Sequence, residues 1–418
     1  MLAVHDAADL FDHQLDAVEH LTGAGAAAMI AAAFDELGVR LDAVRVAEVH
    51  HAPAHSCTVT YDVQLSWPDG SQHHETFVAT SRVDGPPPGA AVLQAGAMTV
   101  GAWRYPFDPC LPGLADLVLP GRSTEVVHDA VGHTVAARVV SYRAGRRAVV
   151  HVEGTRGSCF AKVVAPARLE RFLAVHDGLL AAGVPVPRRL GADPRRGIAV
   201  TAPLPGTTAR EVLERRGRAK VRPELHPALI EELAVSLGRF ERAELGGRPA
   251  RRDPLRDLAA HHQTLARIEP AWCAWLDDLV AAVERGDRDP ARRVVVHGDL
   301  HDGQIVVDRR GHLVGLLDLD DVGLADPADD VANLWGHLRV LGTQRDADHD
   351  GIGRVLRELP DLVRRRDLDP DRVAGRAAAV VIGLATGPFR ARSPHWRSET
   401  TRRLAVASDL LAGAGARV

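Results

Sequence analysis

One stretch of this chain, VVVHGDLHDGQIVVDRRGHLVGLLDLDDV at residues 294–322, limits the possible fold more than any other. In it, short runs rich in β-branched residues alternate with bursts of polar residues, and such runs flanked by Gly and Asp are typical of buried strands. The sequence DRRG at 308–311 is a turn signal, so the second and third runs are predicted to pair as a hairpin. Both acidic bursts then follow strand ends, and we expect a catalytic or metal-binding site there.

Composition excludes several classes of protein. A chain of 418 residues is too long for one core, and a net charge of −4 without a dense basic run argues against nucleic acid as a partner. Four widely spaced cysteines form no CxxC pattern, which argues against a structural zinc site or a disulfide framework. We expect no signal sequence, no membrane-spanning segment and a cytoplasmic protein.

Strand-rich segments come before a helical region. Residues 1–40 carry Ala-rich helical patterns, and strand-rich blocks follow at 44–82 and 126–164. The two blocks resemble each other, which a duplicated unit or the chance similarity of short hairpins explains equally well. The predicted helices after them are 166–182, 224–245, 254–285, 325–342 and 369–386.

The acidic bursts contain residue types that suit phosphate chemistry. Asp299, Gln304 and Asp318 offer carboxylate and amide oxygens, which are ligands that Mg²⁺ accepts, and a further carboxylate can take a proton from a hydroxyl. Any single Asp here is explained as well by a polar cap at a strand end. A zinc-dependent hydrolase using His297, Asp299 and His301 is the alternative, although the chain supplies no partner set such as HExxH.

Lys162 supports the phosphate interpretation. Only Lys162 and Lys220 are lysines in a chain that otherwise uses arginine, and Lys162 stands in the strand-like run CFAKVV. An ammonium group is a compact charge that fits between phosphate oxygens, whereas a guanidinium needs more room. A lysine that merely extends from an edge strand towards water could equally have been arginine.

These motifs together resemble the aminoglycoside phosphotransferase and choline-kinase-like superfamily, whose fold is that of protein kinases. The family motifs HGDxHxxN, IDWxD and GDPxxDLA correspond to HGDLHDGQ, GLLDLDD and ADPADDVANL, and with FAK, GVPVPRRLG and LPG the resemblance spans roughly residues 126–342. It implies an α+β, protein-kinase-like fold of two lobes preceded by a further domain. The predicted boundaries are an N-terminal cap domain at 1–125, a β-rich N-lobe at 126–203 and a mostly helical C-lobe at 204–418.

The resemblance also implies transfer of a phosphoryl group from ATP, with Mg²⁺, to a hydroxyl of a small molecule. By motif position, Asp299 is the catalytic base and Gln304 and Asp318 are the Mg²⁺ ligands. Asp320 assists through a second ion or a water molecule. His297 is expected to support the loop rather than to react.

Nucleotide contacts follow from the same resemblance. Lys162 would bind the α- and β-phosphates, with Glu170 of the next helix as its carboxylate partner. Asp177 is an alternative partner, and a merely solvent-exposed Glu170 fits the sequence nearly as well. The backbone of Ala202 and Leu204 would meet the adenine edge.

Asp326 and Pro327 need no catalytic role, because Asp followed by Pro is a common helix start. Asp329 and Asp330 then lie near the positive end of the helix dipole, where acidic residues are favourable. We interpret all of these residues as structural.

The chain departs from the family pattern in ways that affect its interpretation. Gln304 replaces the usual Asn, as in bacterial maltokinases and related glucosamine kinases, which also carry an N-terminal cap domain. No Gly-rich phosphate loop is evident, since RAGRR at 143–147 and EGTRG at 153–157 are weak candidates. An inactive nucleotide-binding module is therefore an open alternative.

The substrate is expected to be a sugar or an amino sugar, and an aminoglycoside is the alternative. A polycationic antibiotic needs a cluster of carboxylates, for which RDADHDG at 345–351 is the candidate, although it also reads as a solvated loop. The basic segment 386–403 carries aromatic residues that could stack on a sugar ring. The candidate substrate contacts are His301, Asp302, Trp335, Phe389 and Trp396.

Overall fold

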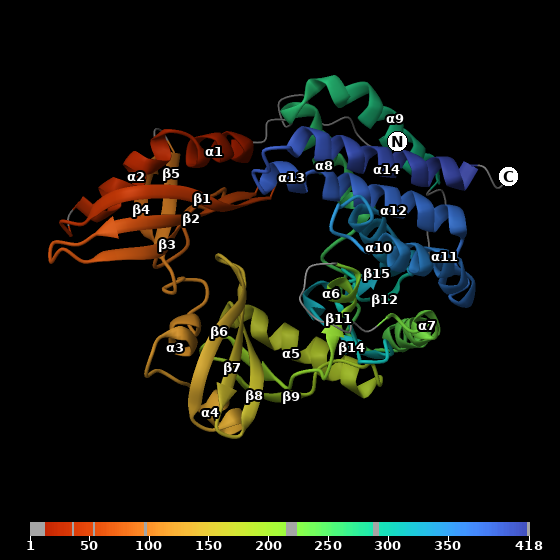
Figure 1. The fold of residues 1–418 in the computed structure, drawn as a ribbon, viewed down its shortest axis with the longest axis horizontal. Helices are drawn as coiled ribbons and strands as arrows, with labels where there is room; N and C mark the ends of the chain where they lie inside the picture. Colours follow the sequence, from red (N-terminus) through yellow and green to blue (C-terminus); the bar gives the residue numbers. More distant parts are fainter. Residues whose placement is uncertain are drawn as a thin grey trace. The chain divides into compact units, whose positions relative to one another are not determined.

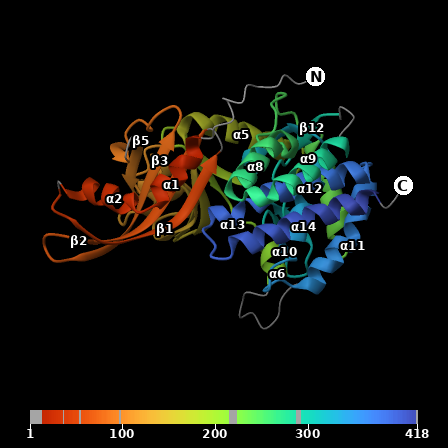
Figure 2. The same cartoon turned by 90° about the horizontal axis from the view of Figure 1, so that it is seen from above.

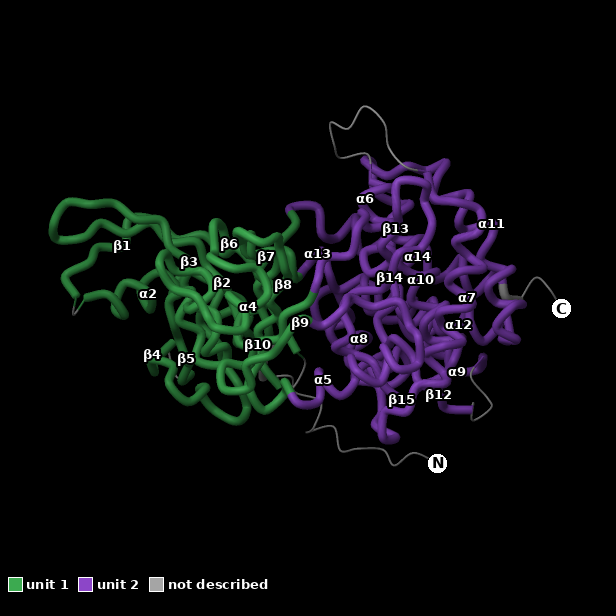
Figure 3. The backbone as a smooth tube through the Cα atoms, turned by 90° about the horizontal axis from the view of Figure 1, so that it is seen from below, with its two compact units in different colours: residues 1–169, 190–201, 390–393 green, residues 170–189, 202–389, 394–418 purple. Residues whose placement is uncertain are grey.

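The computed structural model describes residues 13–35, 37–52, 55–95, 98–214, 224–286 and 292–415. The predicted helical patterns at residues 1–12 lie outside these ranges. The chain divides into two compact units (Figure 3), which are residues 1–169, 190–201 and 390–393 and residues 170–189, 202–389 and 394–418.

The first unit begins with a five-stranded antiparallel sheet in the order β1-β2-β3-β5-β4. Its strands are β1 (Arg40–Ala52), β2 (Ser56–Ser66), β3 (Gln72–Arg82), β4 (Ala91–Ala95) and β5 (Met98–Arg104). Helices α1 (His13–Thr22) and α2 (Gly25–Asp35) pack on this sheet (Figure 1). Alternate residues of β2 are buried beneath them, and the Tyr61 hydroxyl donates to the Leu21 carbonyl at 2.6 Å.

A second five-stranded antiparallel sheet follows in the same unit, in the order β6-β7-β8-β10-β9. Its strands are β6 (Thr134–Arg143), β7 (Arg147–Gly154), β8 (Gly157–Val164), β9 (Arg189–Asp193) and β10 (Ile198–Thr201). Helices α3 (Leu114–Val118) and α4 (Glu125–Val131) contact it, and α5 (Pro166–Ala181) follows β8. The two sheets share one strand order, which is what a duplicated unit would produce.

The second unit is mostly helical. Small sheets join β11 (Thr207–Thr208), β13 (Ile305–Val307) and β14 (Leu313–Leu316), and separately β12 (Val294–Val296) and β15 (Gly323–Ala325). The helices are α6 (Ala209–Leu213), α7 (Leu229–Phe240), α8 (Pro254–Ile268), α9 (Cys273–Gly286), α10 (Ala328–Leu341), α11 (His349–Arg365), α12 (Pro370–Ala385), α13 (Gly387–Arg390) and α14 (Trp396–Gly415). Short 3₁₀ turns stand at Pro270–Trp272 and Leu319–Asp321.

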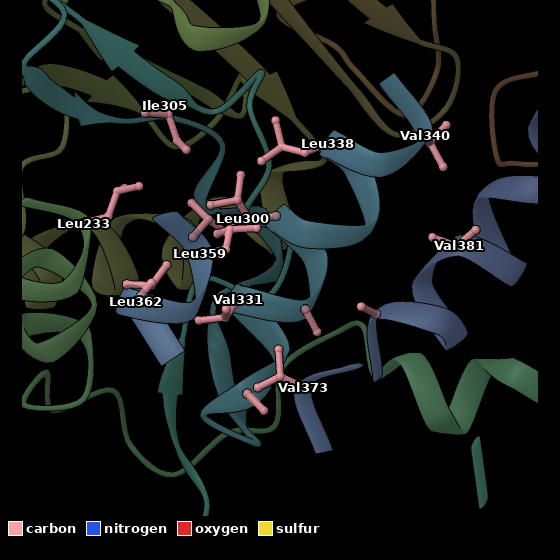
Figure 4. Packing of buried hydrophobic residues seen from close by; sticks show 14 of the residues in the cluster. Leu233, Leu300, Ile305, Val331, Leu338, Val340, Leu359, Leu362, Val373 and Val381 are labelled. Atoms are coloured by element: carbon pink, nitrogen blue, oxygen red, sulfur yellow. The ribbon is translucent and has the colours of Figure 1, made fainter. Parts of the chain in front are cut away.

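Helix α12 is the centre of this unit, where it packs against α8, α9, α10 and α14 (Figure 2). Leu300 inserts from the polar loop after β12 into the same core, beside Val331 of α10 and Leu359 of α11 (Figure 4). Leu300 is fully buried. The hydrophobic core therefore fixes the polar loop at its middle residue.

The predicted α+β class, with a β-rich part before a helical part, is confirmed, and so is the hairpin of β13 and β14. The helix predicted at 254–285 is instead two helices, α8 and α9, because Pro270 has no N–H to donate and starts a 3₁₀ turn between them. Among the described residues, no single helix has both the length and the apolar composition needed to cross a membrane. The bent pair of helices Asp16–Thr22 and Gly25–Asp35 reaches that length and composition only when the two are taken together.

Candidate active site

Two loops of the second unit come together because β12 and β15 pair antiparallel, with Val296 opposite Gly323. The loop 297–304 leaves β12, and the segment 317–322 leads into β15. Gly298 has φ +80°, and a Cβ there would stand 2.4 Å from the Asp321 carbonyl oxygen. Only glycine permits this close approach of the two backbones.

Asp330 of α10 holds the start of the loop. Its carboxylate is buried and accepts hydrogen bonds from the backbone N–H groups of His297 at 2.8 Å and Gly298 at 2.9 Å. Burial raises the pKa of Asp330, against the lowering effect of His297 and the two N–H donors. Sequence analysis assigned Asp330 only to the helix dipole. The available signal was its place as the last Asp of the GDPxxDLA-like motif.

His297 joins the two loops. Its ring is fully buried, Nε2 lies 2.8 Å from the Leu317 carbonyl, and the Asp299 N–H donates to Nδ1 at 3.4 Å. Since a backbone N–H can only donate, Nδ1 is the acceptor and Nε2 carries the proton. Both nitrogens are used, so His297 cannot be the metal ligand that the zinc hydrolase alternative requires.

Asp299 lies at the turn of the loop with 13% of its side chain exposed. Burial raises its pKa to about 6; Arg252 opposes this rise, and the carboxylates of Asp321 and Asp318 add to it. Nη1 of Arg252 donates to Asp299 Oδ1 at 3.0 Å, and Nε of Arg252 lies 2.9 Å from Asp321 Oδ2. A carboxylate with a pKa near neutrality is suited to general-base catalysis.

Arg252 reaches Asp299 from a segment that is bonded to β15. The Leu324 N–H donates to the Arg248 carbonyl at 2.7 Å, and the Ala250 N–H donates to the Leu324 carbonyl at 3.0 Å. Asp253 then caps α8 by accepting from the N–H of Leu255. Arg252 is not among the residues predicted from the sequence, and no local signal indicates it, because its partner is 47 positions away.

His301 and Gln304 form a second pair in the loop. The Gly303 N–H donates to His301 Nδ1 at 3.0 Å, so Nε2 of His301 carries the proton. The Gln304 amide lies 3.1 Å from that Nε2, and its oxygen must be the atom that faces it. An amide oxygen has a second lone pair, which can still bind a cation.

His301 also stacks on His337 of α10, with ring centroids 4.5 Å apart and planes 13° apart. Burial lowers the pKa of His301 to about 3, and burial likewise holds the pKa of His337 well below its usual value. Both rings are therefore neutral. Asp302, expected near the substrate, is buried and pairs with Arg210 at 2.9 Å, so it holds the loop to α6.

The side chains of His301, Asp302 and His337 could be taken for a metal site, because one ligand atom of each lies within 4.8 Å of the others. Imidazole nitrogens bind a metal ion in the ring plane. The two rings are stacked almost parallel, so one ion cannot lie in both planes.

Gln304 and Asp318 come together through the β13–β14 hairpin. Ile305 pairs with Leu316, and the Leu317 N–H donates to the Gln304 carbonyl at 2.9 Å, so Leu317 stands opposite Gln304 and Asp318 is the next residue. Asp318 has φ +58°, a left-handed conformation that Asp tolerates, and Asp320 follows in the 3₁₀ turn. Amide and carboxylate oxygens fit Mg²⁺, which prefers hard oxygen ligands.

Lys162 belongs to β8 of the first unit, where it pairs with Val149 and Ala199. The buried residues Cys159 and Ala161 alternate with it, so Lys162 points to the sheet face opposite the hydrophobic core.

The other predicted nucleotide contacts have different surroundings. Glu170 is exposed on α5, and Asp177 pairs with Arg189 at 3.0 Å. The Ala202 N–H donates to the Arg188 carbonyl at 2.8 Å, so in this structure that N–H is already used. Leu204 is half-buried.

Two of the aromatic candidates, Phe389 of α13 and Trp396 of α14, contact each other. Trp396 meets Phe389 edge to face at 5.3 Å and Trp272 at 6.0 Å, and the Arg397 guanidinium lies 4.3 Å from its ring centre. Trp335 of α10 packs on the helical core.

The model of the phosphotransferase enzyme family matches residues 139–368, which is more than half of the chain. No curated protein matches. Similar solved structures include a thermostable mutant of aminoglycoside phosphotransferase APH(4)-Ia with ADP and hygromycin B, at 13% identity, TM-score 0.47, and coverage of 67% of this chain and 96% of that one. The choline/ethanolamine kinase family protein from Mesorhizobium loti has 15% identity, a TM-score of 0.47, and coverage of 67% and 89%. Choline kinase LicA from Streptococcus pneumoniae has 13% identity, a TM-score of 0.47, and coverage of 68% and 96%.

The match to the family, rather than these distant likenesses, decides the assignment. The chain belongs to the phosphotransferase enzyme family and is a small-molecule kinase whose acceptor is a hydroxyl group.

Proposed function

We propose that this enzyme uses Mg²⁺ and ATP to phosphorylate a hydroxyl group of a sugar or amino sugar. Asp299 takes the proton from the acceptor hydroxyl while a bond forms between that oxygen and the γ-phosphorus. The bond from the γ-phosphorus to the bridging oxygen breaks, and ADP leaves. The observation that carries this proposal is the placement of Asp299: a buried base with a pKa of about 6, on a loop that Asp330, His297 and Leu300 hold still.

The Mg²⁺ ion, when bound, neutralises charge on the phosphates. Gln304 and Asp318 would hold it, and Asp320 would assist. The hydrogen bond from His301 to the Gln304 amide orients the oxygen of a side chain that is one methylene longer than the usual Asn. Lys162 would bind the α- and β-phosphates, because its compact ammonium group fits between phosphate oxygens where the larger guanidinium of an arginine would not.

Arginine side chains act on the two stacked histidine rings, His301 of the loop and His337 of α10. After burial, the next cause that lowers the pKa of His301 is the positive charge of Arg210, and Arg252 acts in the same sense. His337 feels Arg210, Arg252 and Arg403 in the same way. These arginines place positive charge beside the two rings, whereas the carboxylates of Asp318 and Asp321 place negative charge near Asp299.

The segment 345–351 is the candidate carboxylate cluster for a polycationic antibiotic. Asp346 and Asp350 are exposed, and Asp348 precedes helix α11. The segment is therefore a mostly exposed loop that continues into the first residues of α11, which begins at His349. We favour the sugar or amino sugar acceptor for this reason, and a cytoplasmic location, where ATP is available, is part of the proposal.

A panel of acceptors tests this proposal. ADP release with MgATP would be measured for neutral sugars, amino sugars and aminoglycosides, and the phosphate ester would be identified by ³¹P NMR. We expect ester formation with at least one sugar or amino sugar and none with aminoglycosides. Preferred phosphorylation of an aminoglycoside would overturn the acceptor class. Phosphate release without ester would favour a hydrolase, and MgATP binding without any turnover would favour an inactive binding module.

A further inference from the structure

The turn between β6 and β7, residues 143–147, lies at the end of the sheet to which Lys162 belongs. Arg147 pairs with Val164, and Val149 pairs with Lys162, so the turn begins two residues beyond the strand position opposite Lys162. In kinase folds the equivalent hairpin covers the phosphates, and its several glycines let the backbone approach them. This turn, RAGRR, has the single glycine Gly145, at φ +69°.

A buried carboxylate from the N-terminal part of the chain holds this turn. Asp108 is 3% exposed, and its Oδ2 accepts from the Gly145 N–H at 2.7 Å and from the Tyr142 hydroxyl at 2.9 Å. Its other oxygen accepts from the Cys110 N–H at 2.9 Å. The Trp103 indole donates to the Tyr142 hydroxyl at 3.0 Å. Asp108 therefore ties two residues of the turn region to the segment that follows β5.

Packing reinforces these hydrogen bonds. Trp103 of β5, Val78 of β3 and Ala144 of the turn form one buried cluster, to which Tyr142 also packs. A Cβ on Gly145 would stand 3.7 Å from the Trp103 ring, in ordinary contact. The first sheet and the β6–β7 turn thus share a small hydrophobic core within one compact unit.

We propose that Asp108, Tyr142 and Trp103 are positioning residues for the nucleotide: they hold the 143–147 turn in the shape in which it binds the ATP phosphates. The inference rests on the proposed function and gives a task to the first sheet, which precedes the family match at 139–368. A turn with one glycine cannot adapt to the phosphates as a Gly-rich loop does, so a fixed shape replaces adaptability. A preformed turn loses less conformational entropy when the nucleotide binds.

Asp108→Asn is the decisive variant. Three donors, from Cys110, Gly145 and Tyr142, face the two oxygens of this side chain. Asparagine has only one acceptor oxygen, so at least one of these hydrogen bonds must be lost. Tyr142→Phe is the milder variant, because Asp108 keeps the Gly145 N–H. Thr80→Val is the matched control: Thr80 is buried on β3 and bonds to Thr58 and Cys57, within the first sheet.

Isothermal titration calorimetry with MgATP, and steady-state kinetics with the acceptor found in the panel, provide the readouts. We expect Asp108→Asn to weaken MgATP binding about tenfold, equivalent to ~1.4 kcal/mol, and Tyr142→Phe to weaken it about threefold. The KM for the acceptor should stay within about twofold in both variants, and Thr80→Val should bind MgATP like wild type. A general loss of stability would not weaken MgATP binding while leaving the KM for the acceptor unchanged.

The outcomes separate the inference from the proposed function. If wild type does not bind MgATP, the proposed function is wrong. If wild type binds it and the folded Asp108→Asn and Tyr142→Phe variants bind it equally well, the positioning role is wrong. Should Asp108→Asn fail to fold, Tyr142→Phe decides by itself, and an unchanged MgATP affinity in it overturns the inference.

Discussion

Replacing Arg252 by glutamine removes the cation that lies 3.0 Å from Asp299 and leaves a side chain of moderate length that still donates hydrogen bonds. The base must be ionised to accept a proton, so activity is lost as the pH falls through its pKa. Arg252 lowers that pKa against the effect of burial, and the result is a pKa of about 6. Without Arg252 the pKa rises, and the acid limb of the pH profile moves to higher pH.

The size of the shift follows from the exposure of the pair. A neighbouring opposite charge typically lowers a carboxylate pKa by about 1–3 units. The Arg252 side chain is 46% exposed, so solvent screens the interaction, and we take the lower end, about 1 unit. A base whose pKa moves from about 6 to about 7 loses about fivefold in its ionised fraction at pH ~6 and less than about twofold at pH ~8.

The assay is kcat/KM for the acceptor against pH, at saturating MgATP, because this parameter reports groups of the enzyme that is not yet bound to acceptor. Arg252→Lys keeps the charge and should keep the acid limb near that of wild type. Arg256→Gln is the matched control, since Arg256 lies in the first turn of α8, just after the segment that carries Arg252, and pairs with Asp257. An acid limb that stays in place in Arg252→Gln would refute the reasoning.

The remaining predictions concern the loop, the phosphates and the metal. Asp330→Asn leaves a buried N–H of the loop without its acceptor, so urea unfolding should show a loss of about 2–4 kcal/mol. Lys162→Arg and Lys162→Ala should both lose most activity while circular dichroism remains unchanged; full activity in Lys162→Arg would make it an ordinary surface cation. Calorimetry should show that ATP binds tightly only when Mg²⁺ is present, and that Asp318→Asn weakens the binding of both Mg²⁺ and ATP. ATP binding that does not depend on Mg²⁺ would contradict this ligand assignment.

Features set by local sequence could be predicted. The β13–β14 hairpin follows from its turn residues, and α12 begins where Asp369 and Pro370 indicate a helix start. The helix predicted at 254–285 was wrong at Pro270, although proline is a strong helix-breaking signal within a helix. Here the apolar periodicity on both sides hid the interruption.

Partners that are distant in sequence could not be predicted. Arg252 pairs with Asp299 only because the segment before α8 is bonded to β15, and Asp108 reaches Gly145 only because the two sheets share a core. Asp330 could be identified as the last Asp of the GDPxxDLA-like motif, but its hydrogen bonds to the loop form only because α10 lies against the loop. Single-sequence reasoning identifies candidate groups, and tertiary packing decides which charges face each other.

A comparison of Asp299→Asn with wild type, for both MgATP affinity and turnover, tests directly whether Asp299 is the catalytic base. Asparagine keeps the size of the side chain and removes nearly all of its basicity. We expect MgATP affinity within a few-fold of wild type and turnover reduced by ~10²-fold or more, which is the usual contribution of a general base. Turnover that remains close to wild type in Asp299→Asn would contradict the assignment of Asp299 as the base, and with it the mechanism.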